Sequence, residues 1–186
     1  MWIVLVILGV LVLFAVLIYN SLVRLRAQCD GAWADIDVQL KRRHDLIPNV
    51  VETVKGYAGH ERQTLDSVVS ARSRAMAAQG PAAKAEAEGM LTQALKTLFA
   101  LAEAYPQLRA VESFTQLQAT LGQMEEAVQN ARRYYNAVVR DLNTRIQQFP
   151  SNLIANLFGF KLREFFELTT PAEREVPRVS FEPGTR

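Results

Sequence analysis

The sequence has very little of the material from which metal, redox and catalytic sites are usually built. It contains one cysteine, Cys29, and two histidines, His44 and His60. One cysteine excludes a disulfide within the chain, and the two histidines would lie on opposite sides of a common helix. The 21 Lys and Arg nearly balance the 19 Asp and Glu, so no strong overall field attracts nucleic acid. We therefore expect no metal, no cofactor and no nucleic-acid partner.

Residues that break helices are also scarce, and they lie where helices are expected to end. Nine glycines and seven prolines stand against many Ala, Leu, Glu, Gln and Arg, which favour helix. Apolar residues recur in alternating steps of three and four. This heptad-like spacing predicts a long helix to about residue 58, two shorter helices near 65–76 and 87–105, and a second long helix over 114–149. Gly80–Pro81, Pro106 and Pro150 separate the later segments.

The first eighteen residues after the initiator methionine form an uncharged, predominantly apolar run, Trp2–Tyr19. A helix of this length spans about 27 Å, which suits the hydrocarbon core of a bilayer. No basic residue precedes the run and no small-residue cleavage site follows it, so an uncleaved anchor over residues 1–20 is favoured over a signal peptide. The first basic residues, Arg24 and Arg26, follow the run, and the positive-inside rule then places the rest of the chain in the cytoplasm.

Residues 21–149 are expected to fold as an antiparallel four-helix bundle, because none of the four helices can bury its apolar face alone. The two long helices have similar lengths, so paired positions on them should sum to about 171. That register places Arg43 near Glu125 and Glu126, and Asp37 near Arg132 and Arg133. It predicts at least one salt bridge between these clusters. The polar layer predicted from these levels comprises Asp37, Arg43, His44, Glu125 and Arg133.

Pro48 lies inside the first long helix, within the polar stretch "KRRHDLIPN". A proline removes the backbone hydrogen bond to the residue four positions earlier, and it should kink the helix or widen one turn. The carbonyl group near residue 44 then needs another donor, which a nearby basic side chain can supply. We interpret the stretch as a polar layer that fixes helix register.

The segment 150–168 is short and rich in apolar residues, and Pro150 and Gly159 bound its first turn. It is too short to span a bilayer. Three roles stay open: contact with lipid headgroups, a cap on the end of the bundle, or contact with a neighbouring subunit. All three place it beside the anchor. The residues concerned are Leu153, Ile154, Leu157, Phe158, Phe160, Phe165 and Phe166. Residues 169–186 contain three prolines and should form an extended tail.

Four stretches together resemble the LemA family of bacterial membrane proteins. They are "YNSLVRLR", "AWADIDVQLKRRHDLIPNVVETVKGYAGHE", "ARRYYNAVVRDLNTRIQQFP" and "NLIANLFGF", the last followed by "FFE". The resemblance covers nearly the whole chain. It implies an anchor and a helical bundle in the bacterial inner membrane, with the short N-terminus outside and the domain in the cytoplasm. Relatives in the family include a protein of magnetosome membranes, which favours a role in membrane organisation. No catalytic residues follow from the resemblance.

These observations favour a non-enzymatic, single-pass membrane scaffold that assembles with itself. An alternative is an adaptor or regulator that docks a membrane enzyme or protease. A third, less favoured interpretation makes His44 a phosphate acceptor, because "HDLIP" is similar to the histidine box of sensor kinases. Its proline stands one position too early for that box, and no nucleotide-binding domain follows. The expected partners are the lipid bilayer, further copies of the chain and a second membrane protein.

Overall fold

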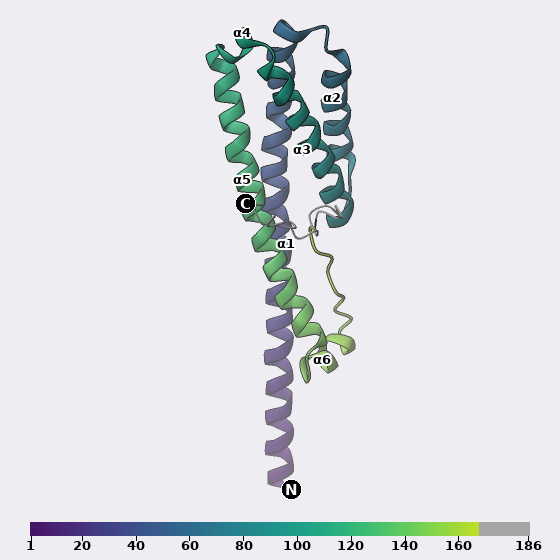
Figure 1. The fold of residues 1–186 in the computed structure, drawn as a ribbon. Coiled ribbons are helices and arrows are strands. Elements are labelled where there is room, and N and C mark those ends of the chain that lie inside the picture. The colour runs from purple at the N-terminus through teal and green to yellow at the C-terminus, as the bar shows by residue number, and fades with distance from the viewer. Residues whose placement is uncertain (168–186) are drawn as a thin grey trace, which may run out of the picture.

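The computed structural model of the protein describes residues 1–167, and within them the fold is all-α (Figure 1). The helices pack side by side into a rod, with short connections between them. No strand occurs in the described residues. The helices are α1 (Trp2–Ala58), α2 (Arg62–Ala77), α3 (Pro81–Glu103), α4 (Pro106–Arg109), α5 (Glu112–Gln147) and α6 (Ser151–Leu157).

Helix α1 runs through both the apolar N-terminus and the first half of the polar domain without a break. Its apolar stretch is long and apolar enough to cross a membrane, with a mean hydropathy of 3.1 over an 18-residue window. Only 6% of that window is buried against the rest of the chain, and Figure 1 shows the helix projecting alone below the other elements. Beyond Tyr19, α1 continues for about 58 Å at 1.5 Å per residue. It ends at Ala58, next to the glycines that weaken the pattern.

Helices α2 and α3 form a hairpin that packs beside the distal half of α1 (Figure 1). The turn between them depends on Gly80, whose φ of 80° is readily accessible only to glycine. Pro81 follows as the first residue of α3, where its missing N–H costs nothing. The predicted break at this position is therefore present, although both helices are longer than the apolar spacing indicated.

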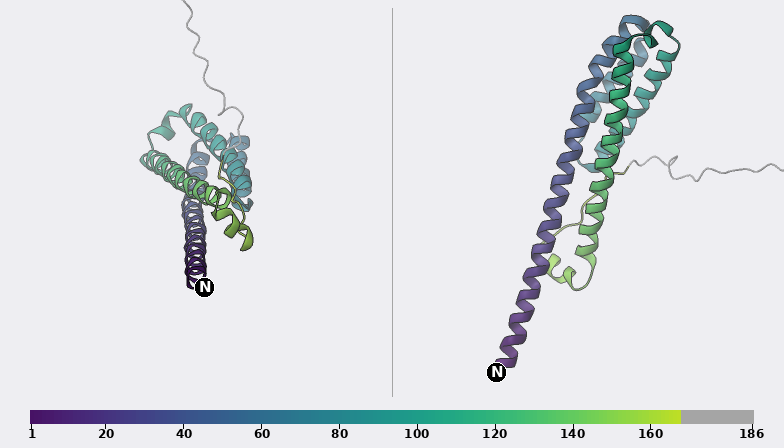
Figure 2. Two further views of the ribbon diagram at one scale, coloured as in Figure 1. Left: turned by 90° about the horizontal axis from the view of Figure 1, so that it is seen from below. Right: turned by 90° about the vertical axis from the view of Figure 1, so that its left-hand side faces the viewer.

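Helix α5 runs antiparallel to α1 and returns toward the membrane end of the rod (Figure 2). Its buried residues include one at every seventh position: Phe114, Leu121, Val128, Tyr135 and Leu142. This repeat keeps one face of α5 against α1 along its whole length. Helix α6 then turns back against α1 beside the end of the apolar stretch (Figure 2).

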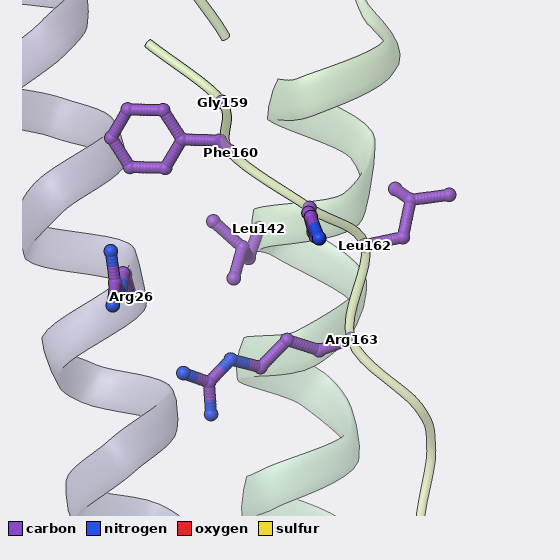
Figure 3. A pocket seen from close by; sticks show the side chains of 7 residues that line it. Arg26, Leu142, Gly159, Phe160, Leu162 and Arg163 are labelled. Carbon is purple, nitrogen blue, oxygen red and sulfur yellow. The ribbon is translucent and has the colours of Figure 1, made fainter. Parts of the chain in front are cut away.

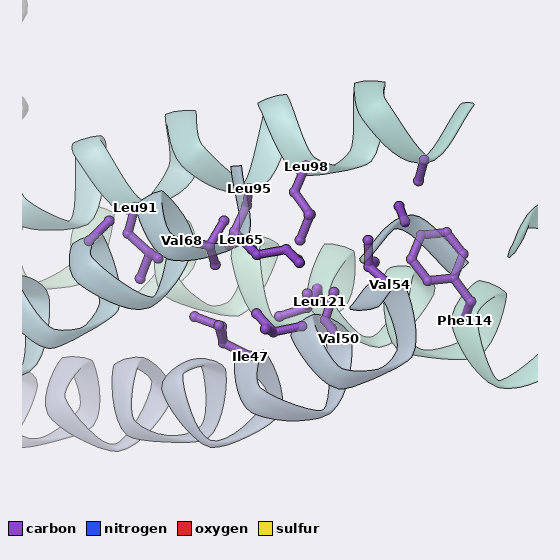
Figure 4. Close-up of a cluster of buried hydrophobic side chains, with 14 of the residues drawn as sticks. Ile47, Val50, Val54, Leu65, Val68, Leu91, Leu95, Leu98, Phe114 and Leu121 are labelled. Carbon is purple, nitrogen blue, oxygen red and sulfur yellow. The ribbon is translucent and has the colours of Figure 1, made fainter. Parts of the chain in front are cut away.

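The interior consists of two apolar clusters, one above the other along the rod. The distal cluster joins α1, α2, α3, α4 and α5 around Val54, Leu91 and Phe114 (Figure 4). The proximal cluster joins α1 and α5 around Leu22, Ile36 and Leu142, and it extends to Phe166. Four helices therefore surround the core only in the distal half. In the proximal half α1 and α5 enclose the core together with α6, the chain after α6 and the beginning of α3, which contribute Ala155, Phe166 and Ala85. This arrangement refines the four-helix bundle predicted from the sequence.

Two further predictions concern Pro48 and the tail from residue 169. Pro48 does not interrupt α1, so the predicted kink or widened turn does not appear as a break in the helix. The extended tail predicted from residue 169 lies outside the described residues.

Candidate functional site

The most polar feature of the interior is a layer that separates the two apolar clusters. Arg43 lies between Leu40 of the proximal cluster and Ile47 of the distal one, and only 3% of it is exposed. Its guanidinium Nη1 lies 3.1 Å from Glu88 Oε2, and its Nη2 lies 3.1 Å from Glu125 Oε2. Nη2 also donates a hydrogen bond of 2.7 Å to the hydroxyl of Thr92. One arginine thus ties α1 to both α3 and α5.

His44 contributes the second contact of this polar layer. Its Nε2 lies 2.6 Å from Glu88 Oε1, and both residues are buried. An ionised Glu88 carboxylate can only accept hydrogen bonds, so with it Nε2 is the donor of this pair. Each oxygen of Glu88 therefore has its own partner on α1, which holds α1 and α3 in a fixed register.

The carbonyl group that Pro48 leaves without a backbone donor is satisfied by an arginine from α2. The Nε of Arg72 donates a hydrogen bond of 2.8 Å to the carbonyl oxygen of His44. The sequence predicted that a nearby basic side chain would take this place, and that prediction is confirmed. Since an unpaired buried carbonyl is costly, this contact lets α1 continue past the proline while it attaches α2 to α1.

The register predicted for the two long helices is correct for Arg43 and wrong for Asp37. Arg43 meets Glu125 as expected. Asp37 accepts a hydrogen bond of 2.5 Å from Lys84 of α3, and that lysine also lies over the ring of Trp33. Arg133 is exposed and donates to Asn130 on its own helix, so it takes no part in the polar layer. The α3 hairpin covers the side of α1 on which Asp37 lies, and Lys84 is the nearer cation.

Three members of this network, Glu88, Thr92 and Lys84, were not predicted. The spacing of apolar residues in the sequence gave only a weak indication of them. Glu88 opens the series Glu88, Leu91, Leu95, Leu98 and Ala102, whose steps of three and four form the buried face of α3. The seam predicted from the sequence comprised Ala87, Leu91, Ala94, Leu98, Leu101 and Tyr105. Its members Ala87, Leu91 and Leu98 are buried, but it did not include Glu88 or Leu95.

The polar layer has room for little more than water on the side of Arg43, whereas on its other side Asp37, His44 and Lys84 line a pocket of about 300 Å³. The cavity beside Arg43, Glu88 and Glu125 measures about 20 Å³, which is room for roughly one water molecule, whereas small-molecule sites take several hundred. In the part of the chain that the structure describes, no group of His, Cys, Asp and Glu side chains could hold a metal ion. His44 is 6% exposed, and its Nε2 is bonded to Glu88.

Around the end of the anchor, three aromatic rings join α1 to the end of α6. The ring of Tyr19 lies 4.7 Å from that of Phe158 and 5.9 Å from that of Phe160, measured between centroids. The segment after α5 therefore lies beside the anchor end of the rod, as the sequence predicted. We call this region the foot, comprising residues 149–162.

The apolar residues predicted to act together in this segment divide into two groups. Ile154, Phe160, Phe165 and Phe166 pack against the proximal cluster. Leu153, Leu157 and Phe158 are each more than half exposed, and so are Phe149 and Leu162, which were not in the predicted set. The first group caps the core, as one of the three interpretations held. The second group forms an apolar surface that the described residues leave uncovered.

Beyond the foot, residues 163–167 form an extended strap held by the side chains of α5. The amide of Asn143 donates to the carbonyl oxygen of Arg163 and accepts from its N–H. Asn136 makes the same pair of bonds with Phe166, two helical turns further along. The hydroxyl of Tyr135 donates to the carbonyl oxygen of Glu164, and Arg163 pairs with Asp30 of α1 at 2.6 Å. The strap thus covers the seam between α1 and α5.

The pKa shifts in the polar domain follow from burial and from one local pair. Burial raises the pKa of the Cys29 thiol and that of the Tyr135 hydroxyl, because both lie in the proximal cluster. The hydrogen bond from Lys41 lowers the pKa of the Asp45 carboxyl on the outer face of α1. That pair lies one helical turn apart, as expected from the sequence.

These features define a class of protein: an all-α rod whose first helix can cross a membrane and whose last helices return to the membrane end. The family model of the LemA family matches residues 32–181, and the chain belongs to that family. It is 25% identical over 175 residues to magnetosome protein MamQ 2 of Paramagnetospirillum magneticum, covering 80% of this chain and 64% of that protein. Protein LemA of Metamycoplasma hominis is 23% identical over 137 residues, covering 73% and 63%. The chain thus spans less than two thirds of the relatives it matches.

Proposed function

We propose that the protein is a non-enzymatic scaffold of the bacterial inner membrane that assembles with copies of itself. The observation that carries this proposal is the continuity of α1 from the apolar stretch to the distal tip, with α5 packed along it. A break between anchor and domain would let the domain swing, whereas one continuous helix holds the tip at a fixed height of about 58 Å above the membrane end. The buried polar layer adds a fixed register between the helices.

The exposed apolar surface of the foot supports a second attachment to the bilayer. Phe158 packs against Tyr19, which lies where the apolar stretch ends and where amphipathic rings prefer to lie, and Leu153 and Leu157 of the same short segment are exposed. Lipid at that level would cover apolar area that otherwise faces water. With the anchor and the foot both attached, the rod would also be restrained from rotating about the axis of α1.

Self-assembly is supported by the face of α1 that turns away from its own core. Small and apolar residues recur along this face at helical spacing and are exposed: Val23, Ala27, Gly31, Ala34 and Val38. Such residues let two helices approach closely. Because every copy stands in the same membrane with the same orientation, the stripe lies at the same height in each, and two copies can pair through identical surfaces.

Sizing the detergent-solubilised full-length protein tests this proposal. We expect a particle larger than one chain, and we expect Ala34→Glu to reduce it to a single chain by placing a charge in the stripe. Gln28→Glu adds the same charge to α1 about 120° around the helix from Ala34 and should leave the particle unchanged. A single chain at all concentrations for the unmodified protein would contradict self-assembly.

An adaptor function is the alternative, and a groove near the tip favours it. The groove lies between α1 and α2, has a volume of about 550 Å³, and is lined by Val51, Leu65 and Val69 together with charged residues. Its occupant would be a segment of another membrane protein. In the sizing experiment an adaptor would run as a single chain and become larger only when a membrane extract is added.

For orientation we propose a cytoplasmic domain, supported by the arginines that follow the apolar stretch, Arg24 and Arg26. A cysteine placed at Gln79, in a Cys29→Ser background, should stay unlabelled by a membrane-impermeant thiol reagent in intact cells. Labelling without permeabilisation of the inner membrane would place the domain outside. The magnetosome proteins among the relatives support a setting in which membranes are organised.

A further inference from the structure

A basic pocket lies just above the foot, where α1, α5 and the chain after α6 meet (Figure 3). Its volume is about 220 Å³. Arg26 comes from α1, Leu142 from α5, and the chain from Gly159 to Arg163 forms the remaining wall. Three of the seven lining residues are cations, Arg26, Lys161 and Arg163, and none is an acid.

The charges around the pocket leave it positive. Arg163 is paired with Asp30, at 2.6 Å, so its charge is largely compensated. Arg26 and Lys161 are exposed, and neither has an ion-pair partner among the described residues. Two free cations therefore face a cavity whose floor, Leu142, and rim, Phe160 and Leu162, are apolar. Such a combination suits a ligand with an anionic head and an apolar body.

The distance of the pocket from the end of the apolar stretch indicates that this ligand is a lipid of the bilayer. Arg26 lies two helical turns beyond Tyr19, which is about 10 Å along α1. The polar headgroup layer extends roughly 5–8 Å beyond the hydrocarbon core, and long basic side chains reach several ångströms back toward it. The ring of Phe160 meets that of Tyr19 edge to face and also lines the pocket, which places the pocket close to the level of the lipid phosphates.

We infer that this pocket binds the phosphate group of an anionic phospholipid. Arg26 and Lys161 contact the phosphate oxygens, and Leu162 and the exposed apolar residues of the foot contact the acyl chains. The Arg163–Asp30 pair fixes the end of the chain from Gly159 to Arg163, which forms the wall. The inference rests on the membrane attachment in the proposed function and adds selectivity for one lipid class. It makes the foot a specific lipid site rather than a general apolar surface.

The experiment uses full-length protein in nanodiscs of phosphatidylcholine that contain a small fraction of spin-labelled lipid. The fraction of motionally restricted label is compared for phosphatidylglycerol and for phosphatidylcholine. We expect a clear preference for phosphatidylglycerol. The double variant Arg26→Gln/Lys161→Gln should lower that preference by about tenfold, since two charge-assisted contacts to phosphate are lost. Both side chains are exposed, so the fold is unaffected, which circular dichroism checks.

The matched control is Arg24→Gln/Arg140→Gln, which removes two exposed charges from the same half of the rod without touching the pocket. It should keep the preference. An equal loss in both variants, or no preference in the unmodified protein, would overturn the inference. Sodium phosphate is then compared with sodium chloride at equal ionic strength: if phosphate alone abolishes the preference, the pocket takes a free anion and the lipid assignment is wrong. A foot that still lies in lipid after such a failure leaves the proposed function intact.

Discussion

The two halves of the rod cover the seam between α1 and α5 with different structures. In the distal half, the seam between α1 and α5 is covered by the α2–α3 hairpin, whose backbone groups are satisfied within their own helices. In the proximal half, the strap covers the same seam, and its backbone depends on Asn136, Asn143 and Tyr135 for hydrogen bonds. A helix that covers the seam needs only side-chain contacts, because its backbone groups are bonded to one another. An extended segment also needs hydrogen-bond partners for its backbone N–H and C=O groups. The distal half should therefore unfold as a unit, and the strap should open by itself.

The largest expected effect is the loss of the carboxylate at the boundary between the halves. Glu88→Ala leaves Arg43 with fewer anionic partners and His44 with none, so we expect it to lower the free energy of unfolding by about 3–5 kcal/mol. Glu88→Gln keeps the volume and part of the hydrogen bonding and should cost less. Denaturant unfolding of the full chain in detergent, followed by circular dichroism, measures both. A loss below about 1 kcal/mol for Glu88→Ala would mean that the polar layer does not hold the halves together.

A second effect in the distal half concerns the carbonyl group of His44. Arg72→Met should cost about 1–3 kcal/mol, because that buried carbonyl loses its donor. In a Pro48→Ala background the backbone N–H of residue 48 supplies the donor, so the same Arg72→Met change should cost distinctly less. The coupling free energy from this double-mutant cycle is the measured quantity. Equal costs in both backgrounds would show that Arg72 does not compensate for the proline.

In the proximal half the effects should be smaller and local. Asn136→Ala or Asn143→Ala removes two hydrogen bonds to the strap, each worth about 1 kcal/mol. We expect faster hydrogen exchange at the amides of Arg163 and Phe166, with little change at amides of the distal cluster. Asn130→Ala, on the same helix but facing solvent, is the control. Exchange that accelerates equally in both halves would contradict separate opening of the strap.

The smallest effect is a pH dependence carried by Cys29. Burial raises the pKa of its thiol above the ordinary value of 9.0, so the folded protein holds the proton more tightly than the unfolded chain. The contribution to stability is complete below pH 9.0 and is lost as the pH rises through the higher native value. Unfolding free energies should therefore fall more steeply above pH 9 for the unmodified protein than for Cys29→Ala. Parallel curves would show that the thiol titrates alike in both states.

The sequence predicted the features that depend on one helix or on two helices of known length. Gly80 and Pro81 determine where α2 and α3 are separated, and the fixed rise per residue was enough to pair Arg43 with Glu125. It also predicted the donor for the carbonyl group near Pro48, because the missing bond follows from the proline itself.

The features that the sequence did not predict depend on the rotation of α3 about its own axis and on the position of the extended strap. Ala87 and Glu88 are neighbours on α3, and only the packing of the hairpin decides that the glutamate is buried between Arg43 and His44. The same packing directs Asp37 to Lys84 instead of to Arg133. The strap has no apolar period of its own. Asn136 and Asn143, which hold it, each follow a buried residue of α5 at a spacing of seven, and this was the one available signal.

The central claim is that the foot of the proximal half contacts the lipid bilayer while the distal half stands away from it. Spin labels at Leu157→Cys in the foot and at Gln79→Cys in the distal turn, each in a Cys29→Ser background, test it in reconstituted bilayers. Their collision rates with oxygen, which concentrates in lipid, and with a water-soluble nickel complex are compared. We predict that the label at 157 collides more with oxygen and the label at 79 more with nickel. A label at 157 as accessible to nickel as the one at 79 would contradict the account.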